Sequence, residues 1–492
     1  MARPRTIVVG GGLSGLCLAH ALIAKGVAVT VFERDAGRDI RGQGYRLTID
    51  DTGSEALRAC LPQRNYDFIR ATAGRAGKTG AFLFLDDRAR ELARFSFDLE
   101  DREQRGYITG QVDRGVLRQA LLSGLEDHTC FGKTFTEYQE RPGGVTARFD
   151  DGSAVAGDIL VGADGVHSRV RRHRLPEAAP RHTGIVGIFG RTPLTPVSLP
   201  VLGPILSTAG ILAMGSRGRV FFCTAMRFRE SPAIAAQRFG IAGGNWPSED
   251  YVMWAVGVRQ PDGVGNGDHD SSVLTHLASQ TVDGFHDDFQ ELVRSADADH
   301  TVLVPIRATP PIGRSAPSRV TLIGDAMHTM PPFGAHGANT ALKDAQVFAS
   351  HFASGCESSR ATETLGAFEA SMHRYSGPII KSALRQMRIA TVDFPFKREI
   401  ARTLFPRGGR ILTNGVILAR PSLNVGVLPK RCRTCRRSPS PEAGRPGAKM
   451  TRAAIGKHTG ALPVDLQIQQ KARLWQTSLR IRTSCSPDSC SK

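Results

Sequence analysis

The segment that most constrains this chain is a glycine-rich turn between a short strand and a helix close to its beginning. Residues 6–9 (TIVV) are apolar and mostly β-branched, as buried strands are. Residues 10–15 (GGGLSG) follow at once, and apolar positions then recur with helical spacing through residue 25. A second apolar run, residues 27–32 (VAVTVF), predicts the next strand. This order predicts a βαβ unit and therefore an α/β fold with a parallel sheet.

The three glycines at positions 10, 12 and 15 have the spacing G-x-G-x-x-G, and each has a physical use. Gly10 permits the tight turn, Gly12 lets the backbone approach a pyrophosphate, and Gly15 lets helix and strand pack closely. Glu33 follows the second strand, where a carboxylate can accept hydrogen bonds from a ribose. An unligated glycine-rich turn is the alternative, but strand, helix and acid together favour a dinucleotide site.

Two later segments repeat the pattern of a strand that delivers an acid to a turn. Residues 158–171 (DILVGADGVHSRVR) carry Asp164, and residues 324–339 (GDAMHTMPPFGAHGAN) carry Asp325. Asp325 can hold ribityl hydroxyls, and the helix that begins beyond Gly337 can stabilise negative charge on a reduced flavin ring. Each segment alone also fits a structural turn, and the first motif alone does not separate NAD from FAD.

In this order and spacing the three motifs resemble the single-component FAD-dependent monooxygenases, which include 4-hydroxybenzoate hydroxylase, salicylate hydroxylase and the tetracycline-inactivating monooxygenases. The resemblance covers about residues 5–400. It implies a Rossmann-like FAD-binding domain with an inserted sheet-rich substrate domain and C-terminal helices. It also implies FAD as cofactor, NAD(P)H and O₂ as co-substrates, and hydroxylation of an aromatic or polyketide-like molecule through a flavin C4a-hydroperoxide, as in secondary metabolism.

The resemblance also implies which residues bind the cofactor. These residues belong to the three motifs or to the arginines near them: Gly10, Gly12, Leu13, Ser14, Gly15, Glu33, Arg34, Arg41, Arg114, Asp164, Gly324, Asp325, Pro332, Gly337, Ala338 and Asn339. The family usually reads P-x-x-G-Q-G-x-N, whereas this chain has Ala335 and His336 in place of the central Gly and Gln. His336 is therefore the candidate catalytic residue, as a donor of a proton or hydrogen bond, and a merely structural histidine is the alternative.

The domain organisation follows from changes in pattern along the chain. Short β-like runs separated by Pro and Gly predict that the inserted domain is rich in strands, and helical patterns dominate from about residue 338. We expect an FAD-binding domain of residues 1–75, 100–180 and 300–355, a substrate domain of 181–299 with 76–99 as a candidate addition, a helical region of 356–429, and a basic, disordered tail of 430–492.

The inserted domain offers five candidate substrate contacts: Phe189, Phe221, Met226, Trp254 and, from the glycine-rich loop, Phe333. Met and aromatic side chains at strand spacing equally fit a hydrophobic core. The substrate is expected to be a small molecule, and the protein a monomer or homodimer.

Charge and cysteines bear on the remaining partners. The net charge is +18, but residues 430–492 hold 14 Lys and Arg against three Asp and Glu, so a short tail carries most of it. A basic tail attracts nucleic acid without base readout, so no specific nucleic-acid partner is expected. Cys432 and Cys435 lack partners at zinc-site spacing, and no metal site is expected.

Other features of composition indicate where the protein works. Its nine cysteines are scattered, which argues against a disulfide framework. No run of 18 apolar residues occurs, and the first apolar run is broken at Gly10 without an A-x-A site, so neither a membrane span nor a signal peptide is expected. We expect a cytoplasmic protein.

Three rival functions differ in what they require. A flavin halogenase needs a W-x-W-x-I-P segment, which the three tryptophans do not form. A non-enzymatic nucleotide-binding or nucleic-acid-binding protein rests on the basic tail alone. An FAD-dependent reductase or dehydrogenase, or an epoxidase, acting on an isoprenoid or polyketide stays open.

Overall fold

The computed structural model describes residues 4–38, 45–75, 78–194, 197–259, 270–313, 315–352 and 358–392. The chain divides into two compact units, residues 1–422 and 423–492, and every described residue belongs to the first. The predictions for Arg41, for Cys432 and Cys435 and for the tail of residues 430–492 fall outside the described ranges.

The glycine-rich turn at the beginning of the chain belongs to a parallel five-stranded sheet with the strand order β17-β11-β1-β2-β7. Helix α1 (Leu13–Ala24) connects β1 to β2, and nearly all of it is buried. The predicted βαβ unit is thus confirmed. The five strands are β1 (Thr6–Val9), β2 (Val29–Phe32), β7 (Thr129–Cys130), β11 (Ile159–Gly162) and β17 (Val320–Leu322).

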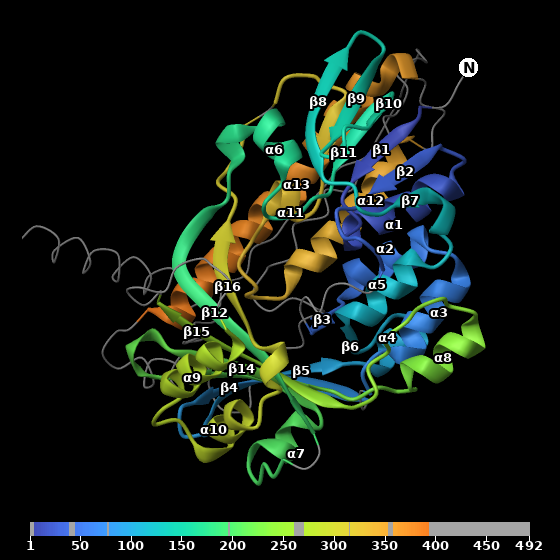
Figure 1. Cartoon of the computed structure of the whole chain (residues 1–492). Coiled ribbons are helices and arrows are strands. Elements are labelled where there is room, and N and C mark those ends of the chain that lie inside the picture. Colours follow the sequence, from blue (N-terminus) through green and yellow to red (C-terminus); the bar gives the residue numbers. More distant parts are fainter. Residues whose placement is uncertain are drawn as a thin grey trace, which may run out of the picture. The chain divides into compact units, whose positions relative to one another are not determined.

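Helices and a small antiparallel sheet surround this parallel sheet (Figure 1). Helix α1 packs against α2, α5 and α12. Asp150-Asp151-Gly152 lies between two short β-like runs, a pattern that predicts a hairpin, and β9 and β10 form it, with β8 pairing on the other side of β9. These elements are α2 (Asp51–Cys60), α3 (Gln63–Thr72), α5 (Arg114–Leu122), α6 (Arg169–Arg174), α11 (Asp325–His328), α12 (His336–Phe352), β8 (Phe135–Arg141), β9 (Gly144–Phe149) and β10 (Ala154–Gly157).

A second sheet has seven strands in the order β16-β12-β15-β14-β13-β4-β5. Two of its strands come from early in the chain, and β4 pairs in parallel with β13 while the other neighbours are antiparallel. The strands are β4 (Thr79–Asp86), β5 (Glu91–Asp98), β12 (Arg181–Pro193), β13 (Ala209–Met214), β14 (Val220–Met226), β15 (Tyr251–Arg259) and β16 (Val302–Ala308).

The two faces of the seven-stranded sheet differ in how they are covered. One face forms a core with helices α7 (Leu202–Leu206), α9 (Ser271–Thr281) and α10 (Asp287–Arg294), and its central side chains are fully buried. Helix α8 (Pro232–Phe239) packs instead against α3. These four helices were not foreseen in the region expected to be rich in strands, because their short amphipathic patterns lie between Pro and Gly breaks.

The opposite face of the seven-stranded sheet is approached by the long helix α13 (Ala361–Thr391), which contains Pro378. Its last turns contact this sheet, where Ala390 packs with Leu212 and Val220. Helix α13 also packs against α12 beside the parallel sheet, so it spans both parts of this unit (Figure 1). Within the described ranges, no helix has the length and apolarity that crossing a membrane requires.

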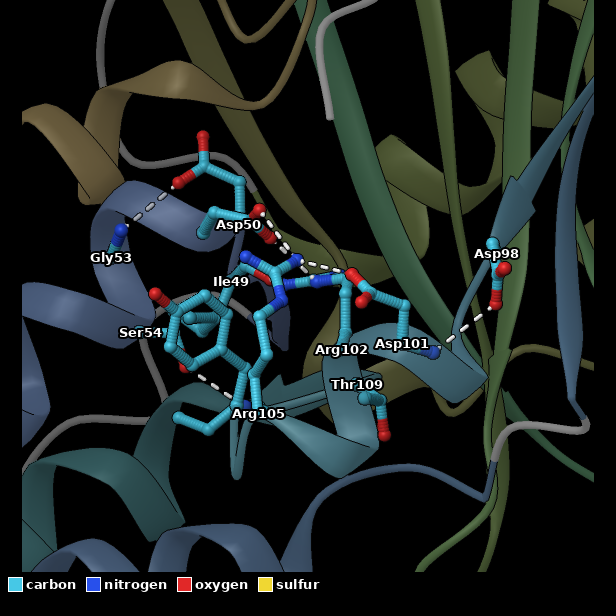
Figure 2. A network of polar contacts seen from close by, with 12 residues as sticks. Ile49, Asp50, Gly53, Ser54, Asp98, Asp101, Arg102, Arg105 and Thr109 are labelled. Atoms are coloured by element: carbon cyan, nitrogen blue, oxygen red, sulfur yellow. Dashed lines mark hydrogen bonds and ion pairs between the residues drawn. The ribbon is translucent and has the colours of Figure 1, made fainter. Parts of the chain in front are cut away.

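A polar network around the short helix α4 (Glu100–Gln104) connects the end of β5 to α2 (Figure 2). Arg102 forms an ion pair with Asp51 at 2.7 Å and donates to the carbonyl of Ile49 at 3.0 Å. Arg105 reaches Asp51 at 3.2 Å and Asp101 at 2.9 Å. These contacts hold the chain where it passes from one sheet to the other.

The two-stranded ribbon of β3 (Arg46–Thr48) and β6 (Gln111–Asp113) corrects one expectation. The frequent Gly and Arg of residues 35–50 predict a loop. Within residues 45–50, which the structure describes, three form a strand, because β6 supplies the backbone partners that the local sequence does not reveal.

Candidate functional site

The first glycine-rich turn combines two packed glycines with one open one. Gly10 has φ +110°, and a Cβ there would lie 2.4 Å from the carbonyl oxygen of Ala163. A Cβ on Gly15 would lie 2.1 Å from the carbonyl oxygen of Gly10. A Cβ on Gly12 would meet only the carbonyl oxygen of Ala163, at 4.0 Å. Packing therefore requires the outer glycines, whereas Gly12 leaves free space at the surface of the turn.

That free space lies at the N-terminus of α1. Gly12 is the N-cap residue, and no side chain caps this helix end. The first intrahelical bond runs from the amide of Leu16 to the carbonyl of Gly12, so the amides of Leu13, Ser14 and Gly15 have no acceptor within the helix. Free amides and the positive end of the helix dipole together attract an anion such as a phosphate.

Glu33 lies at the end of β2 beside the same turn. Its carboxylate is buried and fixed by two backbone amides: Oε2 accepts from Gly11 at 2.6 Å and Oε1 from Asp35 at 2.9 Å. Arg34, the next residue, is exposed. The carboxylate is therefore held rigidly next to the position where the turn leaves room for a ligand.

Asp164 lies next to the first turn, on the side opposite to Glu33. A Cβ on Gly10 would lie 2.8 Å from the backbone nitrogen of Asp164. Its Oδ2 accepts from the amides of Arg169 and Val170 at the start of α6, at 2.7 and 3.2 Å. Its Oδ1 is buried and has no hydrogen-bond partner among the described residues. Burial raises the pKa of Asp164. One oxygen thus holds the helix and the other is a free acceptor.

The third turn comes close to the first as well. Gly324 has φ +59°, and a Cβ there would lie 2.7 Å from Oγ of Ser14. Asp325 is exposed although the residues on either side of it are buried. Arg171 links this turn to the second one, because it donates to the carbonyls of Ala326 at 2.8 Å and Val166 at 2.6 Å. Gly10, Asp164 and Asp325 thus belong to three turns that meet at one place.

A buried carboxylate holds the third turn in position. Asp344 on α12 is fully buried, and its Oδ2 accepts from the amide of Gly324 at 2.7 Å and lies 2.6 Å from Nε2 of His328. Its Oδ1 accepts from the hydroxyl of Tyr375 on α13 at 2.6 Å. Burial favours neutral His328, but Asp344 outweighs this effect and raises the pKa of His328.

The loop before α12 carries the two departures from the family pattern. Ala335, in place of the usual glycine, has φ +57°, a conformation that costs a residue with a Cβ about 1 kcal/mol. His336 begins α12, and its Nδ1 lies 3.8 Å from Oδ2 of Asp50. Gly337 is nearly open, since a Cβ there would meet only Cγ of Met330 at 3.9 Å.

Asn339 fixes this loop to the beginning of α2. Its side-chain amide donates to the carbonyls of Thr48 and Ala335, at 2.9 Å each, and its oxygen accepts from the amide of Asp50 at 3.1 Å. The side chain of Asn339 is therefore fully used within the protein. Of its neighbours, Pro332 is exposed and Ala338 is partly buried.

Arg114 begins α5 and lies near the third turn. Burial lowers the pKa of Arg114, and the neighbouring carboxylate of Asp325 raises it. The structure thus places Arg114 close enough to the carboxylate of Asp325 for their charges to interact. The family resemblance had assigned both residues to cofactor binding. Arg41 lies outside the described residues.

The five candidate substrate contacts do not lie together. Phe221 and Trp254 are fully buried on the helix-covered face of the seven-stranded sheet, with Phe221 5.1 Å from Phe289 between ring centres. Phe189 lies on the opposite face, in register with Ala255 of β15.

Met226 and Phe333 have different surroundings from those rings. Met226 is fully buried, and its sulfur would lie 3.8 Å from a Cβ on Gly74. Phe333 is partly buried and packs against the clusters that α13 forms with the sheet. Phe189 and Phe333 are therefore the two candidates that are not fully buried.

Sequence reasoning missed Arg171, Asp344 and Tyr375. Arg171 lies within an arginine-rich run in which nothing distinguishes the buried one. Asp344 had a detectable signal, because it is a charged residue among the apolar positions of an amphipathic helix. Tyr375 becomes relevant only through the packing of α13 on α12.

Comparisons with known proteins agree with this geometry. Residues 3–228 and 275–382, more than half of the chain, match the FAD binding domain family. The dual O-methyltransferase/FAD-dependent monooxygenase of Cercospora beticola is 30% identical over 375 residues, which cover 71% of this chain and 42% of that protein. The chain thus spans about two fifths of that relative's length.

Two further relatives are covered over most of their length. The 3-amino-4-hydroxybenzoate 2-monooxygenase of Streptomyces platensis is 29% identical over 359 residues, 70% of this chain and 79% of that protein. A solved structure from Photorhabdus luminescens subsp. laumondii, described as a candidate FAD-containing monooxygenase, is 26% identical with a TM-score of 0.67 and covers 79% of this chain and 98% of that one. The match across both sheets, with the three turns in place, establishes that the chain belongs to the FAD-binding domain family.

Proposed function

We propose that this chain is an FAD-dependent monooxygenase that uses NAD(P)H and O₂ to hydroxylate a small aromatic or polyketide-like molecule. The observation that carries the proposal is the meeting of three turns around Gly12, with an uncapped helix end, a free oxygen of Asp164 and the exposed carboxylate of Asp325. Such a set of donors and acceptors matches the pyrophosphate and hydroxyl groups of a flavin dinucleotide.

Each residue has a defined place in this proposal. The amides of Leu13, Ser14 and Gly15 would hold the pyrophosphate, and Glu33 would accept from the adenosine ribose. Asp325 would accept from the ribityl chain. Bound FAD supplies hydride acceptance and the activation of O₂, and the protein supplies binding, orientation and electrostatics.

The loop before α12 would lie along the flavin ring. The 17-residue helix α12 points its N-terminus to this loop, and the positive end of its dipole stabilises negative charge on a nearby ring system. The open surface at Gly337 allows close approach of a planar group. His336, whose Nδ1 lies 3.8 Å from Oδ2 of Asp50, can donate a hydrogen bond in this region.

The class of substrate is inferred from two sources. The relatives named above include a hydroxylase of 3-amino-4-hydroxybenzoate, an aromatic ring, and an enzyme with both methyltransferase and monooxygenase parts. In this chain, the partly buried Phe189 and Phe333 lie beside the face of the sheet that helices α7, α9 and α10 do not cover. An aromatic substrate fits such surroundings.

The test begins with the purified protein. Flavin absorbance after gel filtration, NAD(P)H oxidation stimulated by a phenolic compound, and a product heavier by one oxygen atom would together support the proposal. NAD(P)H oxidation coupled to reduction of the added compound, without oxygen incorporation, would favour the alternative of an FAD-dependent reductase or dehydrogenase. Oxygen added across a carbon–carbon double bond would favour an epoxidase. A colourless protein that does not bind added FAD would exclude all three.

A further inference from the structure

Arg46 on β3 is a partly buried cation without a carboxylate partner among the described residues. Its guanidinium carbon lies 5.0 Å from the ring centre of Phe222 on β14. One terminal nitrogen donates to Oγ1 of Thr48 at 2.8 Å, while Nε is buried and has no hydrogen-bond partner in the part of the chain that the structure describes. Across those same residues, no Asp or Glu lies within ion-pair distance of Arg46.

The electrostatic surroundings leave this charge uncompensated. Burial lowers the pKa of Arg46 from 12.5 to about 10, so the side chain is still protonated near neutral pH. Two groups act to raise the pKa of Arg46 again, namely the hydroxyl of Tyr251 and the thiol of Cys223. Burial raises the pKa of both groups, so both are neutral near pH 7 and supply no negative charge. A buried charge without a counter-charge is unfavourable, so an anion brought to this place would be stabilised.

The surface next to Arg46 is aromatic and incompletely covered. Phe222 stacks on Phe82 with ring centres 6.2 Å apart and an angle of 19° between the rings. Phe84 and Phe333 pack with these rings around the same cluster as Leu212. All four phenylalanines are partly buried, unlike the fully buried side chains on the other face of the sheet. This surface can accept a further planar ring.

A second arginine on the same face shows the ordinary arrangement. Arg191 on β12 pairs with Asp297, with NH2 to Oδ2 at 2.9 Å and Nε to Oδ2 at 3.2 Å. Arg191 therefore carries its own counter-charge, whereas the contacts of Arg46 on the neighbouring ribbon, among the described residues, are with the hydroxyl of Thr48 and the ring of Phe222. Arg46 is therefore the residue to test, and Arg191 is its matched control.

We propose that Arg46 determines substrate specificity by binding an anionic oxygen, carboxylate or phenolate, of an aromatic substrate whose ring lies against Phe222. This rests on the proposed function, in that the site is the substrate site of a flavin hydroxylase. A guanidinium offers several donors in one plane, so it suits a carboxylate better than a neutral amide. The other source of a planar anion is the flavin ring itself, and the experiment separates the two.

The experiment uses the FAD-loaded protein and two probes of the same shape. Binding of 4-hydroxybenzoate and of 4-hydroxybenzamide is measured from the change in the flavin absorbance, in the wild type and in R46M, R46K and R191M. R46M should bind the benzoate about tenfold to hundredfold more weakly, because a hydrogen bond between charged groups is lost, and the benzamide nearly as well as before. R46K should retain part of the preference, and R191M all of it.

Thermal unfolding of the same proteins separates this effect from misfolding. R46M should unfold at or above the wild-type temperature, because it removes an uncompensated charge. Equal losses for both probes, an unchanged preference for the benzoate in R46M, or no binding of the benzoate to the wild type would overturn the inference. Loss of FAD from R46M would assign Arg46 to the cofactor and also overturn it. Wild-type flavin content and oxygenated product report on the proposed function independently.

Discussion

Replacing Asp344 tests whether this buried carboxylate holds the third turn in position. In Asp344→Ala, three donors lose their acceptor: the amide of Gly324, the ring of His328 and the hydroxyl of Tyr375. Each buried donor without a partner costs about 1–3 kcal/mol, so the variant should be less stable by about 3–9 kcal/mol. An unfolding entropy of roughly 2.1 cal/mol/K per residue gives about 1 °C per kcal/mol for the unit of residues 1–422, so the unfolding temperature should fall by at least about 3 °C.

Two milder variants calibrate this result. Tyr375→Phe removes one donor and leaves the carboxylate with its other two partners, so it should cost about 1 kcal/mol. Asp344→Asn can keep its carbonyl oxygen towards Gly324 and His328 and donate its amide to the Tyr375 oxygen, so its cost should be intermediate. Differential scanning calorimetry of the FAD-loaded proteins measures the order, and FAD titration of the apoproteins measures the effect on the turn.

The dependence of this effect on pH has a definite sign. The pKa of His328 is raised in the folded protein, so the stabilisation from its protonated form is fully present below pH 6.5 and is lost as the pH rises through the folded pKa. The difference between wild type and Asp344→Ala should therefore shrink at high pH. If Asp344→Ala unfolds within about half a degree of Tyr375→Phe and binds FAD equally well, the carboxylate does not hold the turn.

Three further predictions concern other parts of this unit. Burial lowers the pKa of His20 from 6.5 to about 4, so the protein should lose up to about 3 kcal/mol of stability as the pH falls through that range, and His20→Gln should flatten this dependence in urea unfolding at pH 7 and 4.5. Ala335→Gly relieves the strain of the left-handed backbone conformation, but glycine also gives the unfolded chain more conformational freedom. Because these two effects oppose each other, the free energy of unfolding should change by less than about 1 kcal/mol in either direction. Gly12→Ala should leave the unfolding temperature of the apoprotein unchanged but weaken FAD binding at least about tenfold, whereas Gly15→Ala should reduce both.

Each of these predictions has an outcome that contradicts it. A His20→Gln protein as sensitive to acid as the wild type would assign the loss to other groups. A loss of several kcal/mol in Ala335→Gly would mean that the methyl group makes contacts that outweigh the strain. Equal FAD binding by Gly12→Ala and the wild type would place the pyrophosphate away from the first turn.

The elements of the parallel sheet could be predicted from the sequence because local and long-range signals agree there. Residues 6–9 and 27–32 form strands of that sheet within two residues of the predicted bounds, and the short apolar run at residues 320–323 forms β17. Glycines in fixed positions mark the turns between strands and helices, since packing at Gly10 and Gly15 tolerates no side chain.

The features that sequence could not reveal depend on partners far along the chain. Strand β3 exists because β6 pairs with it, and the role of Asp344 depends on the packing of α13 on α12. Arg46 looked like one of many surface arginines, because a sequence does not show whether a carboxylate lies nearby. Phe221 and Trp254 were grouped with Phe189 because strand spacing does not tell which face of a sheet helices will cover.

The hydrogen bonds of Asn339 have a consequence for how the protein acquires its cofactor. Asn339 donates to the carbonyl of Thr48 across 291 positions of the chain. Contacts between such distant segments form slowly, since a long loop must first be closed. A ribosome making this protein will have released the first turn, which we propose binds the pyrophosphate, long before it synthesises Asn339. We expect nascent chains shorter than about 350 residues to be unable to retain FAD. Stable binding of the cofactor should therefore begin only late in the synthesis of the chain.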